Sequence, residues 1–298
     1  MSIAETHSNE SVGPRVLVTG HQGMVGRVVV RTLLDASFDV VGLDIIEGDD
    51  VVDPRTVAER IRGCRFVVHL AALDEEPEER GELDPPSTGG IEQILRTNVG
   101  GTALLLGKAA EEGVERVVFL SSADVLGCFI GQGRPAYLPI DDHHPLDPQG
   151  PYAWSKLVGE ELVATFTTVT GAASVCLRAP GVFDTSTYDF IRASRSDNPE
   201  SEWAPFWEYG AFIDVRDLAS AVTAALTVPG LSGHHRLLVN ADDLSSAAED
   251  APTLVERLLP DVPLHSSIRL EQDRFAALLE TGLARAVLQW EPEHRWRP

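Results

Sequence analysis

The sequence predicts an α/β fold, a doubly wound parallel sheet followed by a small C-terminal substrate-binding part. Short runs rich in Val, Ile and Leu alternate with segments whose apolar residues recur at helical spacing. A glycine-rich turn joins the first run to the first helix, and small or polar residues follow several later runs. Because the strands of such a sheet run in one direction, these residues are expected at one rim, where ligands bind.

The first buried strand leads directly into the glycine-rich turn. Arg15–Thr19 is a β-branched apolar run, and helical spacing begins at Arg27 after three spaced glycines. Strand, glycine-rich turn and helix in this order are typical of a dinucleotide-binding Rossmann domain, in which the helix N-terminus faces the pyrophosphate. The predicted cofactor contacts here are Gly20, Gln22, Gly23, Met24, Val25 and Gly26.

A second strand, Phe38–Leu43, ends on an acid. Asp44 at this position can accept hydrogen bonds from the adenosine ribose and would repel a 2′-phosphate. Ile45 and Ile46 follow without an arginine for such a phosphate, so the sequence favours NAD over NADP, with Ile45 beside the cofactor. Asp53 precedes the next helix-like segment and is interpreted either as its cap or as an adenine contact.

The third strand, Cys64–Leu70, ends on small residues. Ala71 and Ala72 would let the backbone lie close to a cofactor. The stretch 74–90 that follows is acidic and rich in proline and glycine, which predicts a loop.

The next helix and strand complete the predicted rim. The helix at 91–113 contains Asn98, and the strand at 116–120 runs into Ser121 and Ser122. Residues from distant parts of the sequence thus meet at the carboxyl ends of the strands, namely Thr19, Asp44, Ala72 and Ser122.

The helix after the loop at 132–150 predicts the chemistry. Pro151 begins this helix, which runs to about residue 170 and holds Tyr152 and Lys156 one turn apart on the same face. A nearby ammonium favours the phenolate and lowers the pKa of a tyrosine, which is ordinarily about 10. Such a pair can take a proton from a substrate hydroxyl as hydride leaves the carbon, or return it in reverse.

The rest of the chain predicts a smaller part with fewer regular elements. The expected elements are a strand at 173–178, an irregular segment at 188–209, a helix from 212, a strand at 235–240, and helices at 254–259 and 275–288. The predicted organisation is a mobile tail at 1–13, an NAD-binding domain at 14–180 and a substrate-binding part at 181–298, with 212–228 packing back on the first domain.

Composition excludes several classes of function. The chain carries 46 acidic and 24 basic residues, a net charge of −22, which repels nucleic acid and anionic membranes. Three separated cysteines without a Cys-x-x-Cys pair indicate reduced thiols in the cytoplasm. The first 13 residues are polar, unlike a signal peptide or an anchor, and no run is apolar enough to span a bilayer.

Together these motifs resemble the extended short-chain dehydrogenase/reductase family, in its NAD-dependent epimerase/dehydratase branch. The resemblance covers nearly the whole chain after the tail. The matching pieces are Val18-Thr-Gly20-x-x-Gly23-x-x-Gly26, Asp44, His69-Leu-Ala-Ala72, Asn98-Val-x-Gly-Thr102, Ser121-Ser122-x-x-Val-x-Gly127, Tyr152-x-x-x-Lys156 and Phe212-Ile-x-Val-x-Asp-Leu-Ala219.

The resemblance implies roles for the predicted residues. Tyr152 would be the acid/base, Lys156 would lower its pKa and hold the nicotinamide ribose, and Ser122 would bond the reacting oxygen. Asn98 matches a helix position associated with the architecture of the active site. The implied cofactor contacts further include Asn98, Tyr152, Lys156 and, around the strand ends, Leu70, Ala71, Ala72 and Pro180.

Departures from the family pattern bear on the substrate. Sugar dehydratases of the family resemble one another in a Thr-Asp-Glu triplet where this chain has Ser122-Ala-Asp124. The first acid of the triplet is missing, so the sequence disfavours a dehydratase. The diphosphate-gripping arginine of nucleotide-sugar enzymes is absent before Phe212, although Arg192 or Arg195 could substitute. The pattern is closer to uronate-dehydrogenase-like members. The predicted substrate contacts are Asp124, His143 and Arg192.

The sequence thus predicts an NAD-dependent oxidoreductase acting on a secondary hydroxyl or ketone of a sugar, sugar acid or cyclitol-like substrate. An epimerase that oxidises its substrate transiently is the first alternative, and a non-catalytic NAD sensor is the second. The histidine pairs His143-His144 and His234-His235 lack the acid or cysteine spacing of a metal site. By family resemblance, the helices around 98–112 and 152–170 predict a homodimer.

Overall fold

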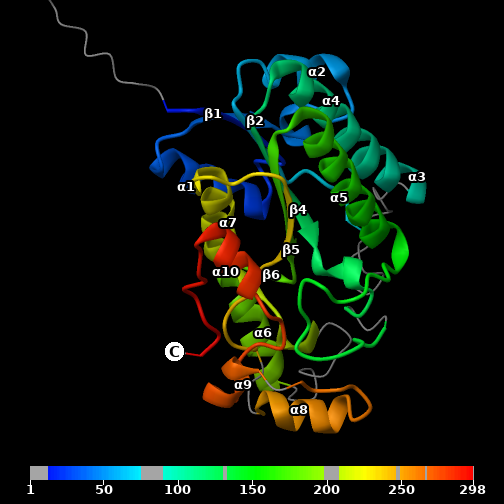
Figure 1. The fold of residues 1–298 in the computed structure, drawn as a ribbon, viewed down its shortest axis with the longest axis vertical. Coiled ribbons are helices and arrows are strands. Elements are labelled where there is room, and N and C mark those ends of the chain that lie inside the picture. Colours follow the sequence, from blue (N-terminus) through cyan, green and yellow to red (C-terminus); the bar gives the residue numbers. More distant parts are fainter. Residues whose placement is uncertain are drawn as a thin grey trace, which may run out of the picture.

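The fold is a parallel sheet with helices on both faces, in a computed structural model that describes residues 13–74, 90–129, 133–197, 208–245, 249–265 and 267–297 (Figure 1). Each strand pairs in parallel with its neighbours. The order across the sheet is β2 (Asp39–Leu43), β1 (Arg15–Thr19), β3 (Phe66–His69), β4 (Arg116–Ser122), β5 (Ala173–Ala179) and β8 (His234–Leu238). This confirms the predicted doubly wound class, and β8 from the C-terminal part forms one edge.

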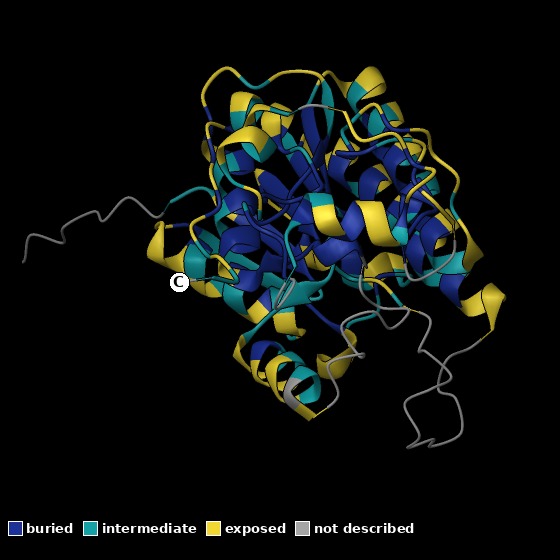
Figure 2. Cartoon of the chain, turned by 90° about the horizontal axis from the view of Figure 1, so that it is seen from below, coloured by how far each residue is buried: buried dark blue, intermediate teal, exposed yellow. Residues whose placement is uncertain are grey.

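Helices cover both faces because successive strand residues point to opposite sides. Val16 and Val18 of β1 pack in one cluster, and Leu17 between them packs in the other. The buried residues gather in the middle of the molecule, and the exposed residues lie on the outer sides of the helices and on the loops (Figure 2). The first cluster includes residues of α1 (Met24–Asp35), α7 (Val215–Thr227) and α10 (Gly282–Leu288). The second includes residues of α2 (Pro54–Arg60), α4 (Thr102–Glu112) and α5 (Gly150–Thr170).

The helix predicted at 91–113 is continuous but irregular. It consists of α3 (Ile91–Ile94), a π-helical segment (Leu95–Gly101) and α4. Wide π-helical turns inside α-helices are often found at functional sites. Asn98 lies within this segment and is buried.

The smaller part lies beyond the carboxyl ends of the strands (Figure 1). An apolar cluster there joins Leu254 and Leu279 of this part to Leu138 and Ile140 of the segment before α5. Its elements are the strand pair β6 (Val182–Phe183) and β7 (Ile213–Asp214), the helices α6 (Thr185–Asp197), α8 (Ala251–Leu258) and α9 (Ile268–Gln272), and a short 3-10 turn (Glu208–Gly210).

Two expectations for this part were wrong. The segment predicted to be irregular from residue 188 begins inside α6, whose start is stabilised because Asp184 accepts from Thr187 N at 2.8 Å. The helix predicted at 275–288 forms only from Gly282, because Ala276 and Leu279 instead make β-bridges to Asp243 and Ile140.

Other predictions fall outside the described residues. They concern the tail at 1–12, most of the loop at 74–90, and the aromatic segment with Trp203, Phe206 and Trp207. Within the ranges given above, no helix has the length and apolar character needed to cross a membrane.

Candidate active site

β1 lies between β2 and β3 in the sheet. The order of the strands therefore reverses at β1, and the carboxyl ends of β1 and β3 lie side by side at this point. Ligands of open α/β sheets bind at such a switch point. Gly20 follows β1 with a φ of +70°, and a Cβ added to it would lie 2.8 Å from Ala71 N. The turn after β1 therefore needs glycine for both its conformation and its contact with the end of β3.

The other two glycines differ in how much room they have. A Cβ on Gly26 would lie 2.1 Å from Gly20 O, so α1 packs directly on the turn. A Cβ on Gly23, the N-cap of α1, would meet only Gly20 O, at 3.4 Å. The first turn of the helix, with Met24 and Val25, thus has an open approach, and this turn fits the pyrophosphate of a dinucleotide.

Asp44 is buried at the end of β2 and organises the turn. Its Oδ2 accepts from Gln22 N at 2.8 Å, and its Oδ1 accepts from Ile46 N at 3.0 Å. A carboxylate has about four acceptor positions, so Asp44 retains capacity for ribose hydroxyls. Ile45 is 66% exposed beside it, whereas Asp53 caps α2 by accepting from Arg55 N and Thr56 N.

A buried network beneath the rim was not predicted. His69 Nδ1 lies 2.6 Å from Thr19 Oγ1, and His69 Nε2 lies 2.8 Å from Thr102 Oγ1. Burial and the nearby charge of Lys156 lower the pKa of His69 to about 3, so the imidazole is neutral. Thr19 Oγ1 also accepts from the backbone N–H groups of Leu70 and Ala71, which fixes the end of β3.

Asn98 connects this rim to α5. Its Oδ1 accepts from Leu73 N at 2.7 Å and its Nδ2 donates to Leu73 O at 2.8 Å. Nδ2 also donates to Ser155 Oγ at 2.9 Å. Ser155 is fully buried, and it lies between Tyr152 and Lys156 in the sequence. It was not predicted as a site residue from the sequence. Its position directly before the lysine was the available signal.

Ser122, Tyr152 and Lys156 meet at the carboxyl end of β4. Ser122 ends that strand and forms a side-chain hydrogen bond with Tyr152. The Nζ of Lys156 lies 5.5 Å from the centre of the Tyr152 ring and donates to Leu120 O at 2.8 Å. Lys156 is buried, so its ammonium is held in one place by its surroundings.

The electrostatics of the pair differ from the prediction. Burial raises the pKa of Tyr152 well above its ordinary value, and the charges of Asp74 and Asp124 raise it further, whereas the bond with Ser122 lowers it in part. Burial lowers the pKa of Lys156 to about 8. The predicted lowering of the Tyr152 pKa is therefore wrong for the cofactor-free chain, because desolvation and two carboxylates outweigh one ammonium.

The predicted substrate contacts have different surroundings. Asp124 is partly buried and accepts from Ser122 Oγ at 3.0 Å, directly at the site. His143 is exposed in the loop before α5. Arg192 lies on α6, where its guanidinium stacks 5.1 Å from the centre of the Trp296 ring and 5.4 Å from that of Tyr188. Pro180 is buried directly after β5.

The other histidines of the two predicted pairs form local hydrogen bonds. His144 Nε2 accepts from Ala136 N, and His234 Nδ1 lies 2.8 Å from Ser174 Oγ. His235 Nε2 lies 2.9 Å from Ser232 O. Across the described ranges, no group of three or more metal-binding side chains is arranged to hold an ion.

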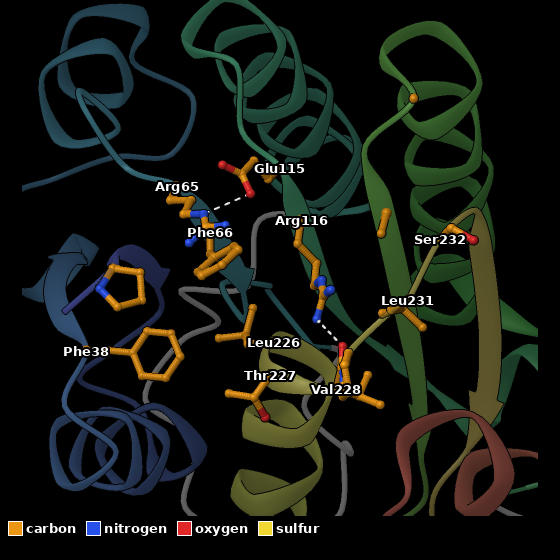
Figure 3. A pocket seen from close by; sticks show the side chains of 14 residues that line it. Phe38, Arg65, Phe66, Glu115, Arg116, Leu226, Thr227, Val228, Leu231 and Ser232 are labelled. Carbon is orange, nitrogen blue, oxygen red and sulfur yellow. Dashed lines mark hydrogen bonds and ion pairs between the residues drawn. The ribbon is translucent and has the colours of Figure 1, made fainter.

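A cavity of about 480 Å³ lies at the opposite, amino-terminal end of the sheet (Figure 3). Its two arginines are committed to the fold. Arg65 forms an ion pair with Glu115 at 2.8 Å. Arg116 Nη1 donates to the carbonyl oxygen of Ala225 in α7 and to that of Val228, the C-cap of this helix. Because the predicted residues lie at the other end of the strands, this cavity is separate from the candidate active site.

Comparison with curated proteins finds relatives of low identity. A UDP-glucose 4-epimerase of Azospirillum brasilense is 30% identical over 56% of this chain and 49% of its own length. A uronate dehydrogenase of Pseudomonas syringae pv. tomato is 28% identical over 61% of this chain and 64% of its own. These alignments thus span about half to two thirds of the relatives. A UDP-glucose 4-epimerase of Streptomyces lividans is 27% identical over 93% of this chain and 91% of its own.

Solved structures agree on the fold. A short-chain dehydrogenase/reductase superfamily protein from Agrobacterium tumefaciens with bound NAD superposes with a TM-score of 0.67 at 22% identity, covering 95% of this chain and 93% of its own. A UDP-glucose 4-epimerase from Brucella ovis in complex with NAD superposes with a TM-score of 0.66 at 22% identity, covering 94% of each chain.

A sequence profile extends this likeness to family level. It matches residues 16–239, which include the glycine-rich turn, Asp44 and the segment with Ser122, Tyr152 and Lys156. The match supports NAD as the cofactor, in agreement with the fit of the turn and of Asp44 to a dinucleotide. The chain belongs to the NAD dependent epimerase/dehydratase family.

Proposed function

We propose that this chain is an NAD-dependent oxidoreductase that interconverts a secondary hydroxyl and a ketone on a sugar, sugar acid or cyclitol-like molecule. The observation that carries the proposal is the contact of Tyr152 with Ser122, with Lys156 one turn away. These three side chains share the carboxyl rim of the sheet with the glycine-rich turn. An acid/base beside a cofactor site is the minimum that such a reaction needs.

Each residue of the site has a chemical task in this proposal. Bound NAD supplies the acceptor for the hydride that leaves the substrate carbon. Tyr152 exchanges the proton of the substrate hydroxyl. Lys156 has three N–H donors and uses one on Leu120 O, so it can also hold ribose hydroxyls of the cofactor. Asn98 forms hydrogen bonds with Leu73, which follows β3, and with Ser155 in α5. It thereby positions the backbone segments that border the site.

An epimerase is the second candidate. The Streptomyces lividans relative, which aligns over most of this chain, is a UDP-glucose 4-epimerase. An epimerase would use the same first step, then return the hydride to the other face of the ketone. Both candidates need an acid/base at Tyr152, and a protein that only senses NAD would not.

The test is a cofactor-reduction assay with product analysis. Purified protein is mixed with NAD or NADP and a panel of free sugars, uronates, cyclitols and nucleotide sugars. NADH that accumulates with one substrate class identifies a dehydrogenase, and isomerised substrate without NADH identifies an epimerase. Tyr152→Phe should remove either activity, and full activity in this variant would refute the mechanism.

The assembly and location are further parts of the proposal. We expect a homodimer formed through the outer faces of α4 and α5, where Trp154 is 53% exposed. Light scattering that gives a single-subunit mass at micromolar concentration would contradict this. We also expect a cytoplasmic enzyme with a small-molecule substrate, without nucleic-acid or membrane partners, and with a smaller substrate-binding part from residue 181.

A further inference from the structure

A second carboxylate, that of Glu47, contacts the glycine-rich turn beside Asp44. Asp44 is the N-cap of a short 3-10 helix, Ile45–Glu47. Because a 3-10 helix has three residues per turn, Glu47 returns to the side of the helix on which Asp44 lies. Both carboxylates bind the same residue of the glycine-rich turn. Asp44 Oδ2 accepts from Gln22 N at 2.8 Å, and Glu47 Oε1 accepts from Gln22 Nε2 at 2.8 Å.

His21 gives Glu47 a second contact with the turn. His21 Nε2 lies 3.3 Å from Glu47 Oε1 and 3.0 Å from Gln22 Nε2. The His21 ring fits here because residue 42 is glycine, and a Cβ on Gly42 would lie 2.5–2.7 Å from three atoms of that ring. Glu47 therefore has a defined position against the turn, although its side chain is 42% exposed.

The other acids of this segment are used within the chain. Residues 44–53 contain five acids and neither lysine nor arginine. Asp49 forms an ion pair with an arginine of α2, and Asp50 and Asp53 accept from backbone N–H groups that follow them in the sequence. Only the two acids that contact the glycine-rich turn are thus placed to act on a cofactor.

These two acids differ in how much of their charge is open. Asp44 is buried and has a backbone N–H on each carboxylate oxygen. Glu47 accepts its bonds on Oε1, and nothing among the residues that the structure describes donates to its Oε2. Glu47 therefore presents a carboxylate charge next to the acid that fits the adenosine ribose.

We propose that Glu47 is a second specificity-determining residue of the cofactor site, whose charge, positioned by Gln22, disfavours the 2′-phosphate of NADP. Asp44 supplies acceptors for the ribose hydroxyls, and a phosphate on the 2′ oxygen would come beside both acids. A phosphate monoester carries close to two negative charges at neutral pH, so an open carboxylate repels it. The inference concerns cofactor choice, so it applies equally to a dehydrogenase and to an epimerase.

The first test measures the Kd values of NAD and NADP by fluorescence quenching in the wild type and two variants. Glu47→Gln keeps Oε1 as an acceptor for Gln22 but removes the charge, so the ratio of the NADP Kd to the NAD Kd should fall about 10-fold. Glu111→Gln removes one exposed charge in the last turn of α4, away from the carboxyl rim, and should keep the wild-type ratio. A wild-type ratio in Glu47→Gln would overturn the proposal.

Ionic strength separates the charge of Glu47 from its shape. Salt screens exposed charges, so the difference between wild type and Glu47→Gln should shrink as the salt rises from about 0.01 M to about 1 M. A difference of the same size at both concentrations would overturn the electrostatic account.

The positioning role of Gln22 has its own variant. Gln22→Ala keeps the backbone N–H that Asp44 accepts and removes the side-chain bond to Glu47. The ratio should therefore change in the same direction as in Glu47→Gln, but by less, and a wild-type ratio would overturn the role of Gln22. These measurements use the cofactors alone, without any substrate. A failure of the proposed function, which the Tyr152→Phe assay detects, is thus distinguishable from a failure of this inference.

Discussion

Asn98 donates from Nδ2 to Ser155 Oγ at 2.9 Å, and this bond joins the π-helical segment to α5. Ser155 in turn donates to Tyr152 O at 2.7 Å. The backbone that carries Tyr152 is therefore held, through Ser155, by an asparagine that lies 57 positions before that serine in the sequence. The same amide binds both backbone groups of Leu73, so one side chain connects the end of β3 with α5.

Replacing Asn98 should loosen both attachments. Asn98→Ala leaves the N–H and C=O of Leu73 and the hydroxyl of Ser155 without their partner, and should cost about 1–3 kcal/mol of unfolding free energy. Ser155→Ala removes only the attachment to α5 and should cost about 0.5–1.5 kcal/mol. Urea unfolding measures both. Equal stability of Asn98→Ala and wild type would show that the bonds contribute nothing.

Local patterns made most of the cofactor site predictable. The strand at 15–19 and the spaced glycines that follow it are adjacent in the sequence, and the structure has β1 at those residues. Helix α6 was missed although Asp184 and Thr187 offered a capping signal, because the aromatic and polar residues around them have weak periodicity.

Contacts between distant segments could not be predicted from the sequence. No pattern indicated that Asn98 and Ser155 would meet, because 57 positions separate them in the sequence. The pKa of Tyr152 was predicted in the wrong direction because burial, the largest cause of its rise, depends on the whole fold, and because the charges of Asp74 and Asp124 come from other segments of the chain.

The glycine-rich turn should be intolerant of a single methyl group at Gly26. Gly26→Ala would place its Cβ 2.1 Å from Gly20 O, a backbone atom, so α1 would have to move from the turn. We expect this variant to lose NAD binding, which is measured by fluorescence quenching. Gly107→Ala in α4 is the matched control, because a Cβ there meets nothing within 4 Å and alanine favours a helix by about 1 kcal/mol. Unchanged NAD affinity in Gly26→Ala would contradict the close packing.

The buried ion pair of Glu160 and Arg178 should be essential for stability. Arg178 Nε and Nη2 donate to the two carboxylate oxygens at 2.9 and 2.7 Å, and both residues are almost fully buried. Arg178→Met leaves Glu160 without this partner and should cost about 3–5 kcal/mol, measured by urea unfolding.

Two controls separate burial from charge. Glu111→Gln removes an exposed partner of Lys108 and should cost less than about 1 kcal/mol. Adding Glu160→Leu to Arg178→Met removes the buried carboxylate, whose remaining partners are Arg236 Nε at 3.2 Å and Ser121 Oγ at 2.6 Å, and should restore part of the lost stability. A double variant less stable than Arg178→Met would contradict this account.

Asp142 should make the stability of the fold depend on pH. Burial raises the pKa of Asp142 from its ordinary 3.8 to about 6, although Leu238 N donates to its Oδ1 and the charge of Arg178 opposes the shift. Between these two values the folded chain holds a proton that the unfolded chain has released. Stability from this group is therefore present below about pH 4 and is lost as the pH rises to about 6, by about 3 kcal/mol for a shift of about two units. Asp142→Asn keeps an oxygen for Leu238 N and carries no charge, so it should raise the melting temperature more at pH 8 than at pH 4. Equal shifts at the two pH values would show that Asp142 titrates normally in the folded chain.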